Sequence, residues 1–198
     1  TQTITNGIDL SGEGGLVWVK NRDVARSHYT TDTELAKRLR PDGTEAMESS
    51  SQLSFNSDGF NAAGGDQDTS DSNANTYASW TFRKAPKFFD VVTYTGNGTA
   101  GRTISHNIDT TVGMLIVKRT DSAGDWSVFH RKLNGGTNSG NYRVELQNTV
   151  GESTTSHWNN TVPSSTHFTV GNSNTVNGNG GTYVAYVFAH NDGDGEFG

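Results

Sequence analysis

The chain of 198 residues contains no cysteine. It can therefore form no disulfide framework, no thiolate metal site and no thiolate nucleophile. It also lacks a run of about 18 apolar residues, which a membrane-spanning helix requires, so we expect no membrane insertion. Hydrophobic residues make up only 31% of the chain. This low fraction argues against a large α/β core and favours thin sandwiches that bury one face of each strand.

Basic residues are also scarce, since 15 Lys and Arg face 21 Asp and Glu and give a formal net charge of -6. Binding to the phosphate backbone requires a basic patch, so no nucleic-acid partner is expected. The chain begins at Thr1 rather than Met and shows no signal-peptide pattern. We therefore expect a processed chain or a piece of a longer one, stabilised by burial, oligomerisation or bound ions.

Catalytic motifs are missing as well. The histidines form neither an HxH nor an HExxH motif, so the sequence contains no recognisable zinc-binding motif. Neither the G-x-S-x-G elbow of hydrolases nor the P-loop occurs. A glycosidase needs two carboxylates at a fixed separation, but Glu145 stands alone in YRVELQ and Glu152 lies in a predicted loop. The sequence therefore predicts that the protein is not an enzyme.

Short strand patterns dominate what is present. The one helical candidate is 33–39, TELAKRL, which Pro41 closes. Apolar or alternating segments, separated by clusters rich in Gly, Ser, Thr and Asn, predict strands at 16–20, 89–94, 102–108, 114–119, 126–131, 142–147, 167–171 and 182–190. Many short strands between Gly-rich turns predict an all-β fold built from antiparallel β-sandwiches of the lectin or jelly-roll kind.

Four sequence blocks recur in the same order. GLVWVK, ITNGID, Gly-Phe and NTYASWTF in the first half match GMLIVK, ISHNID, His-Phe and GTYVAYVF in the second half; the matched ranges are 15–20 with 113–118, 4–9 with 104–109, 59–60 with 167–168 and 75–82 with 181–188. Agreement in order and residue type predicts a tandem duplication of a unit of about one hundred residues. We assign repeat 1 to 1–84, repeat 2 to 88–190, and the start of a next linker to 191–198.

The runs GLVWVK and GMLIVK are apolar on both alternations, which predicts a buried central strand in each repeat. Trp18 and Trp80 are expected in the core, and Lys20 and Lys118 are expected where the central strands reach solvent. Repeat 2 opens with FFDVVTYTGNG (88–98), for which nothing comparable precedes Thr1. Repeat 1 is therefore predicted to lack its leading strand, which leaves a sheet edge open or supplied by another chain, as in a fragment of a longer array.

The strings VWVKNRD (17–23), SFNSDGF (54–60), FRKAPKFFDVVTYTGNG (82–98) and ISHNID (104–109) resemble a domain of unknown function common in tail and tail-fibre proteins of marine tailed bacteriophages. That domain occurs there in tandem, and the resemblance covers nearly the whole chain. The sequence departs from it near Thr30 and at 35–36. The resemblance implies a lectin-like sandwich in an extracellular virion location. The implied partners are other virion proteins and further copies of the chain, as in a homo-oligomer such as a trimer. It transfers no catalytic residue.

Two groups of residues are candidates for binding a glycan. Trp158, Asn159 and Asn160 lie in a predicted loop, where an exposed Trp beside Asn residues suits stacking on a sugar. The alternative is that Trp158 caps the end of the sandwich. Trp126 and His130 share one face of the strand 126–131, and both could line a groove or pack structurally.

Acidic loops are candidates for binding Ca²⁺, which takes six to eight oxygen ligands. Asp66, Asp68 and Asp71 lie in GGDQDTSDSN (64–73), and a second acidic group lies in DGDGEFG (192–198). Neither loop matches the EF-hand pattern. Solvated acidic loops are the alternative, and no other cofactor is predicted.

The tandem repeat and the Cys-free acidic composition, together with the virion context that the resemblance implies, lead us to expect a structural, non-enzymatic module of a tail fibre or surface decoration that contacts a glycan on the host surface. Two alternatives stay open. A tailspike depolymerase that cleaves glycans would need a pair of catalytic carboxylates across a cleft. A bacterial adhesin repeat would need calcium in the acidic loops.

Overall fold

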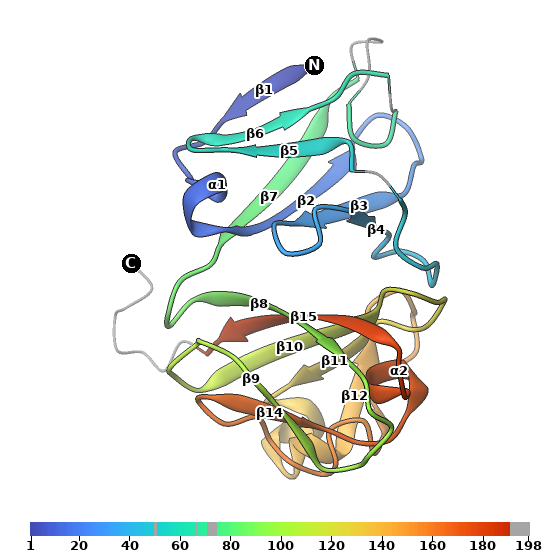
Figure 1. The fold of residues 1–198 in the computed structure, drawn as a ribbon. Coiled ribbons are helices and arrows are strands. Elements are labelled where there is room, and N and C mark those ends of the chain that lie inside the picture. The colour runs from blue at the N-terminus through green and yellow to red at the C-terminus, as the bar shows by residue number, and fades with distance from the viewer. Residues whose placement is uncertain (50, 66, 71–74, 191–198) are drawn as a thin grey trace. The chain divides into compact units, whose positions relative to one another are not determined.

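The computed structural model describes residues 1–198 except 50, 66, 71–74 and 191–198 (Figure 1). The described chain consists of short antiparallel strands with a few single-turn helices, which confirms the predicted all-β class. It divides into two compact units, Thr1–Lys84 and the part from Ala85 onward. No helix in the described ranges is long and apolar enough to cross a membrane.

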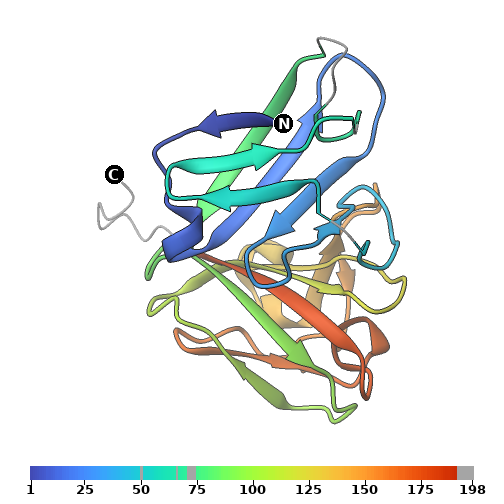
Figure 2. The same ribbon diagram turned by 45° about the horizontal axis from the view of Figure 1, so that its top comes forward.

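Unit 1 contains two sheets, which Figures 1 and 2 show as separate layers. The first has the order β4 (Arg38–Leu39), β3 (His28–Asp32), β2 (Gly15–Asn21), β7 (Tyr77–Arg83), and the second has the order β1 (Gln2–Thr5), β6 (Gly59–Ala62), β5 (Leu53–Asn56). The short helix α1 (Leu10–Glu13) follows β1. Apolar side chains from both sheets form the core, namely Leu10, Val17, Val19, Leu53, Phe60 and Ala62.

Unit 2 has a larger sheet and a strand pair. The sheet order is β13 (Ser153–Thr154), β12 (Tyr142–Glu145), β11 (Ser127–His130), β10 (Val112–Arg119), β15 (Thr182–Ala189), β8 (Phe89–Thr95), and the pair is β14 (His167–Val170) with β9 (Arg102–Ser105). The helical turns are η1 (Leu133–Gly136), η2 (Ser139–Asn141) and α2 (Asn174–Asn177). The core between the two layers includes Leu115, Val117, Phe129, Trp158, Phe168, Tyr183 and Val187.

Each unit contains cross-strand pairs whose members correspond to a pair in the other unit. Strand β2 places Trp18 opposite Trp80 of β7, and β10 places Ile116 opposite Tyr186 of β15. In the second layers, the pairs are Ile4 with Phe60 and Ile104 with Phe168. In every case the two members of one pair align in sequence with the two members of the other.

The units differ at one sheet edge. In unit 2, β8 covers β15 along its length, with pairs from Thr182–Thr95 to Phe188–Phe89. In unit 1, β7 pairs with β2 only, so among the described strands it forms the edge of its sheet. An edge strand leaves a row of backbone groups without a ladder partner.

A buried asparagine fixes the chain directly after β8. The Nδ2 of Asn177 donates to Asn97 Oδ1 at 3.2 Å, to the Thr99 carbonyl at 2.9 Å and to the Gly171 carbonyl at 2.8 Å. Its Oδ1 accepts from the Asn97 backbone N–H at 3.0 Å. The end of β8 is therefore held against the connection between β14 and β15.

The helical candidate 33–39 forms a turn in the connection before β4, and Ala36 has a positive φ of 51° that a continued helix does not allow. Two expectations for single residues are wrong. Lys118 is fully buried, and its Nζ donates to the Arg119 carbonyl at 2.7 Å. Trp80 is 49% exposed rather than in the core, because it lies on an edge strand and points away from the interior of unit 1.

Candidate functional site

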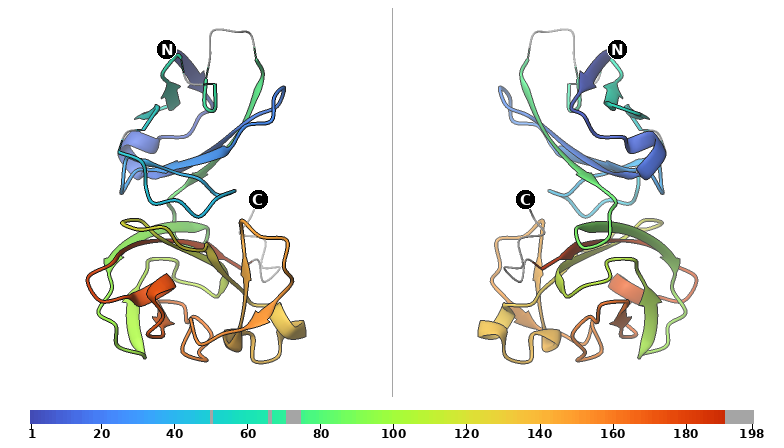
Figure 3. Two further views of the ribbon diagram at one scale, coloured as in Figure 1. Left: turned by 90° about the vertical axis from the view of Figure 1, so that its right-hand side faces the viewer. Right: turned by 90° about the vertical axis from the view of Figure 1, so that its left-hand side faces the viewer.

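A pocket of about 350 Å³ lies between the two sheets of unit 1 beside the edge strand β7. Figure 3 shows these sheets as facing layers. We call this pocket the β7 groove, which is lined by Gln2, Ile4, Val19, Phe60, Ala62, Thr69, Asn75, Thr76, Tyr77 and Ser79. Its volume is at the lower end of the range of ligand sites, roughly 300–1,000 Å³.

The β7 groove has an apolar floor and a polar rim. Val19 and Phe60 belong to the buried core of unit 1. Ser79 lies opposite Val19 in the ladder, so both side chains are on the inner face, and the small serine leaves space above the core. At the rim, Tyr77 donates its hydroxyl hydrogen to the Gln67 carbonyl at 3.1 Å. The Thr69 Oγ1 is buried and has no hydrogen-bond partner within the described residues.

The backbone of β7 adds donors and acceptors beside this pocket. Backbone bonds from Lys84 N–H to the Gly14 carbonyl and from Arg22 N–H to the Thr76 carbonyl fix the phase of the β2–β7 ladder. In that phase the even-numbered residues of β7 bond to β2. The N–H and C=O groups of Ser79 and Thr81 therefore point to the open side, where the described chain places no strand.

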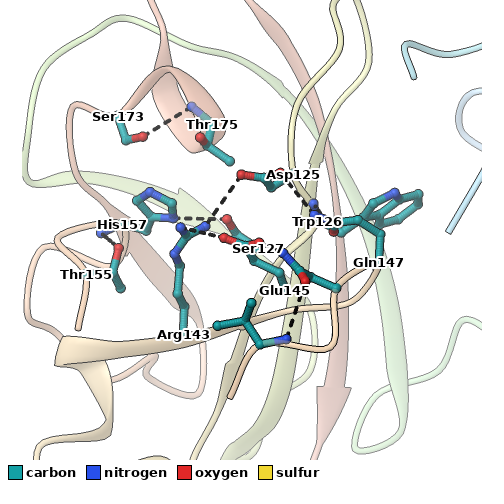
Figure 4. Close-up of polar contacts among 12 residues, drawn as sticks. Asp125, Trp126, Ser127, Arg143, Glu145, Gln147, Thr155, His157, Ser173 and Thr175 are labelled. Atoms are coloured by element: carbon teal, nitrogen blue, oxygen red, sulfur yellow. Dashed lines mark hydrogen bonds and ion pairs between the residues drawn. The ribbon is translucent and has the colours of Figure 1, made fainter. Parts of the chain in front are cut away.

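Unit 2 contains a polar cluster, shown in Figure 4, that holds a buried serine and histidine. Ser127 Oγ lies 3.0 Å from His157 Nδ1. Arg143 is paired with Glu145 at 2.6 Å and lies 4.0 Å from Asp125. The Ser127 side chain is fully buried, so a substrate cannot reach its hydroxyl. The geometry of Ser127 and His157 is that of a structural hydrogen bond between β11 and the loop after β13, and it does not suit a catalytic nucleophile and its base.

Burial lowers the pKa of His157 to about 4, and the positive charge of Arg143 adds to the effect. Between pH 6.5 and 4, His157 is protonated in the unfolded chain but neutral in the folded chain. The stability of the folded state therefore falls as the pH drops through this window. The expected loss is roughly 3 kcal/mol, because one pKa unit corresponds to about 1.4 kcal/mol. Denaturant unfolding from pH 7.5 to 4 should show that His157→Gln weakens this dependence. Equal slopes for the two proteins would contradict it.

The residues predicted to bind a glycan do not form an exposed aromatic platform. Trp158 is fully buried, its Nε1 donates to the Tyr142 carbonyl at 2.9 Å, and its ring packs edge-on against Phe129. The expectation that this indole is exposed is therefore wrong. Trp126 is also buried, at 1% exposure, and stacks on Tyr186. An indole without exposed surface cannot stack on a sugar.

The remaining candidates for glycan binding are His130, Asn159 and Asn160. His130, at the end of β11, is exposed. Asn159 and Asn160 follow Trp158 in a turn with positive φ values of 50° and 55°. Asn tolerates this left-handed conformation better than most residues do, so the backbone conformation alone explains why Asn occurs at both positions. Their predicted contact with a glycan stays a prediction.

The calcium prediction concerns loops that are only partly described. Asp66 and Asp71 lie outside the described residues, as do the acidic residues of 192–198. Asp68 is half-buried. Among the residues that the structure describes, no group of three His, Asp or Glu side chains could hold a metal ion. Calcium binding therefore stays a prediction.

Sequence reasoning did not single out the residues of the β7 groove. Phe60, Tyr77 and Ser79 read as ordinary strand residues, and nothing in their local sequence marks a pocket. The available signal was the segment 88–98, which has no counterpart in the first half of the chain. It predicted an open sheet edge, but a pocket behind that edge follows only from the arrangement of the two layers.

Comparison with known proteins gives one match. A family model described as "Domain of unknown function (DUF7483)" matches residues 1–198. Neither a curated protein nor a solved structure shows significant similarity to the chain. Because the family model spans both units, the chain belongs to the DUF7483 family, whose function is uncharacterised.

Proposed function

We propose that the chain is a structural, non-enzymatic module of an extracellular virion appendage and that it binds other polypeptide chains of the assembly. The observation that carries this proposal is the open edge of β7 beside the β7 groove. An unprotected edge is a template for pairing with another chain, and proteins commonly block it with lysine, proline or a bulge. The β7 sequence, YASWTFR, has no proline and no charge before Arg83.

We further propose that the two units are tandem copies of one β-sandwich. The support is the agreement between sequence matching and strand register. The β2–β7 pairs from Leu16–Phe82 to Asn21–Tyr77 correspond to the β10–β15 pairs from Met114–Phe188 to Arg119–Tyr183, and the β1–β6 pairs correspond to the β9–β14 pairs. Modules that repeat in this way suit an elongated assembly.

The virion location rests on the resemblance to phage tail and tail-fibre domains. A chain without cysteine gains no stability from disulfides, and assembly with partners stabilises the folded state by mass action. Attachment to a glycan on the host surface stays a prediction, and the burial of Trp158 and Trp126 gives it no support. The burial of Ser127 removes the Ser127–His157 pair as support for a catalytic alternative.

Immunoelectron microscopy tests the proposed location. Antibodies raised against the chain should label the tails or fibres of virus particles whose genome encodes it. Pre-absorption of the antibodies with the purified chain is the control and should abolish the labelling. Label confined to bacterial cell surfaces would overturn the virion proposal in favour of an adhesin, and absence of label from particles and cells alike would also overturn it.

A further inference from the structure

We propose that the β7 groove binds a β-strand with the sequence pattern of β8, supplied by another domain of the same family. The strand would pair with the open edge of β7, and its inward-facing tyrosine would fill the pocket. This inference rests on the proposed role in assembly and gives the β7 groove a partner. It follows from what β8 does in unit 2.

In unit 2, Tyr94 of β8 fills the space between the two layers. Its ring stacks on Tyr183 with centroids 5.1 Å apart and meets Phe168 edge-on at 6.0 Å. The Arg102 guanidinium lies 5.8 Å from the centre of the same ring. Tyr94 and its neighbour on the same face, Val92, both pack against the core of unit 2.

The same positions in unit 1 line the β7 groove. Strand register and sequence matching relate Tyr183 to Tyr77, Phe168 to Phe60 and Arg102 to Gln2. All three unit 1 residues line the pocket. The β7 groove of unit 1 therefore corresponds to the space that Tyr94 fills in unit 2.

A buried polar atom points to the same occupant. In unit 2 the Tyr94 hydroxyl donates to the Val176 carbonyl at 2.7 Å, on the connection between β14 and β15. The corresponding connection in unit 1, between β6 and β7, carries the buried Thr69 Oγ1 that lacks a partner among the described residues. Burying a hydroxyl without a hydrogen bond destabilises the folded state. An incoming tyrosine hydroxyl would provide the missing bond.

The hydrogen-bonding phase of the β7 backbone also matches that of β15, its counterpart in unit 2. Bonds from Ala189 N–H to the Phe88 carbonyl and from Gly96 N–H to the Gly181 carbonyl close the two ends of the β8–β15 ladder. In that phase the backbones of Ala185 and Val187 face β8. Their counterparts in β7 are Ser79 and Thr81, whose backbones face the open edge.

One contact of β8 is already replaced in unit 1. The Asp90 carboxylate accepts from the Asn107 backbone N–H at 2.8 Å. The position matching Asn107 is Gly7, whose N–H already donates to the Asp58 carboxylate at 2.8 Å. The incoming strand therefore needs its tyrosine and not an acidic residue at the Asp90 position. This asymmetry gives the experiment an internal control.

The test uses the full chain and a synthetic peptide of residues 86–98, PKFFDVVTYTGNG. We expect saturable binding by isothermal titration calorimetry and slower hydrogen exchange over 77–83. The peptide change Tyr94→Ala should weaken binding at least about tenfold, because it removes a buried aromatic contact. The peptide change Asp90→Asn should leave affinity unchanged. The chain variant Ser79→Pro should lose binding, because it removes an edge donor.

Absence of binding would overturn the inference, and so would binding that is indifferent to the peptide's tyrosine. Protection at 182–189 instead of 77–83 would show that the peptide replaces β8 in unit 2 and would also overturn it. A dimer of the chain through paired β7 edges, formed without peptide, would assign the edge to a second copy instead. Immunolabelling of virus particles is independent of the peptide, so failure here leaves the proposed location to stand or fall on that measurement.

Discussion

Trp158→Ala is expected to lower the free energy of unfolding of unit 2 by about 3–5 kcal/mol, the usual cost of removing a fully buried Trp. The indole has no exposed surface and packs against Phe129 in the core of unit 2. Its loss leaves a cavity and leaves the Tyr142 carbonyl without the bond from Nε1. Hydrogen exchange read by mass spectrometry over unit 2 in increasing urea measures the effect.

Trp80→Ala is the matched control for this prediction. Trp80 is 49% exposed and contacts Trp18 edge-on at 6.4 Å, so its removal should cost about 1 kcal/mol or less. If the Trp158 variant unfolds no more readily than the Trp80 variant, Trp158 is not a core residue. A role for its indole at the surface would then return.

Proline at two matched positions should have opposite consequences. Ala185 and Ser79 correspond in the two units, but β15 lies between two strands and β7 has one neighbour. Ala185→Pro removes a buried donor to β8 and adds atoms to a packed core, so it should cost about 3 kcal/mol or more. Ser79→Pro removes an N–H that faces the open edge and should cost at most about 1 kcal/mol.

Urea unfolding followed by hydrogen exchange in each unit separates the two variants. The expected pattern is early unfolding of unit 2 in Ala185→Pro, with unit 1 unchanged in Ser79→Pro. A large loss of stability in Ser79→Pro would mean that the β7 edge is paired within the chain. It would then not be available to a partner.

The sequence predicted the central strands of the fold because their residues satisfy two conditions at once. In β2 and β10, apolar residues fill both alternations, and turn residues bound each run. Strand β3 escaped prediction because its sequence, HYTTD, is mostly polar. Asp32 at its end is buried and accepts from the Glu34 and Leu35 backbone N–H groups. A polar residue satisfied by nearby backbone carries no hydrophobic signal.

The candidate site could be predicted only in outline. A Trp followed by two Asn residues has the local pattern of an exposed loop, yet the loop at 158–160 turns its indole into the core. That burial depends on Phe129 and Tyr142, which are distant in sequence. The open edge of β7 was predictable, because it followed from a segment present once instead of twice. The pocket behind it depends on the separation of two layers, which no local pattern encodes.

The position of β15 bears on how unit 2 is built during synthesis. It is the last described strand in the chain, yet it lies between β10 and β8. Its pairing with β8 joins residues that are 87 (Thr95 and Thr182) to 99 (Phe89 and Phe188) positions apart, and such long-range closure slows folding. Until the ribosome has released β15, β8 and β10 have no strand between them, so the nascent sheet is expected to expose two unpaired edges to the chaperones of the cell.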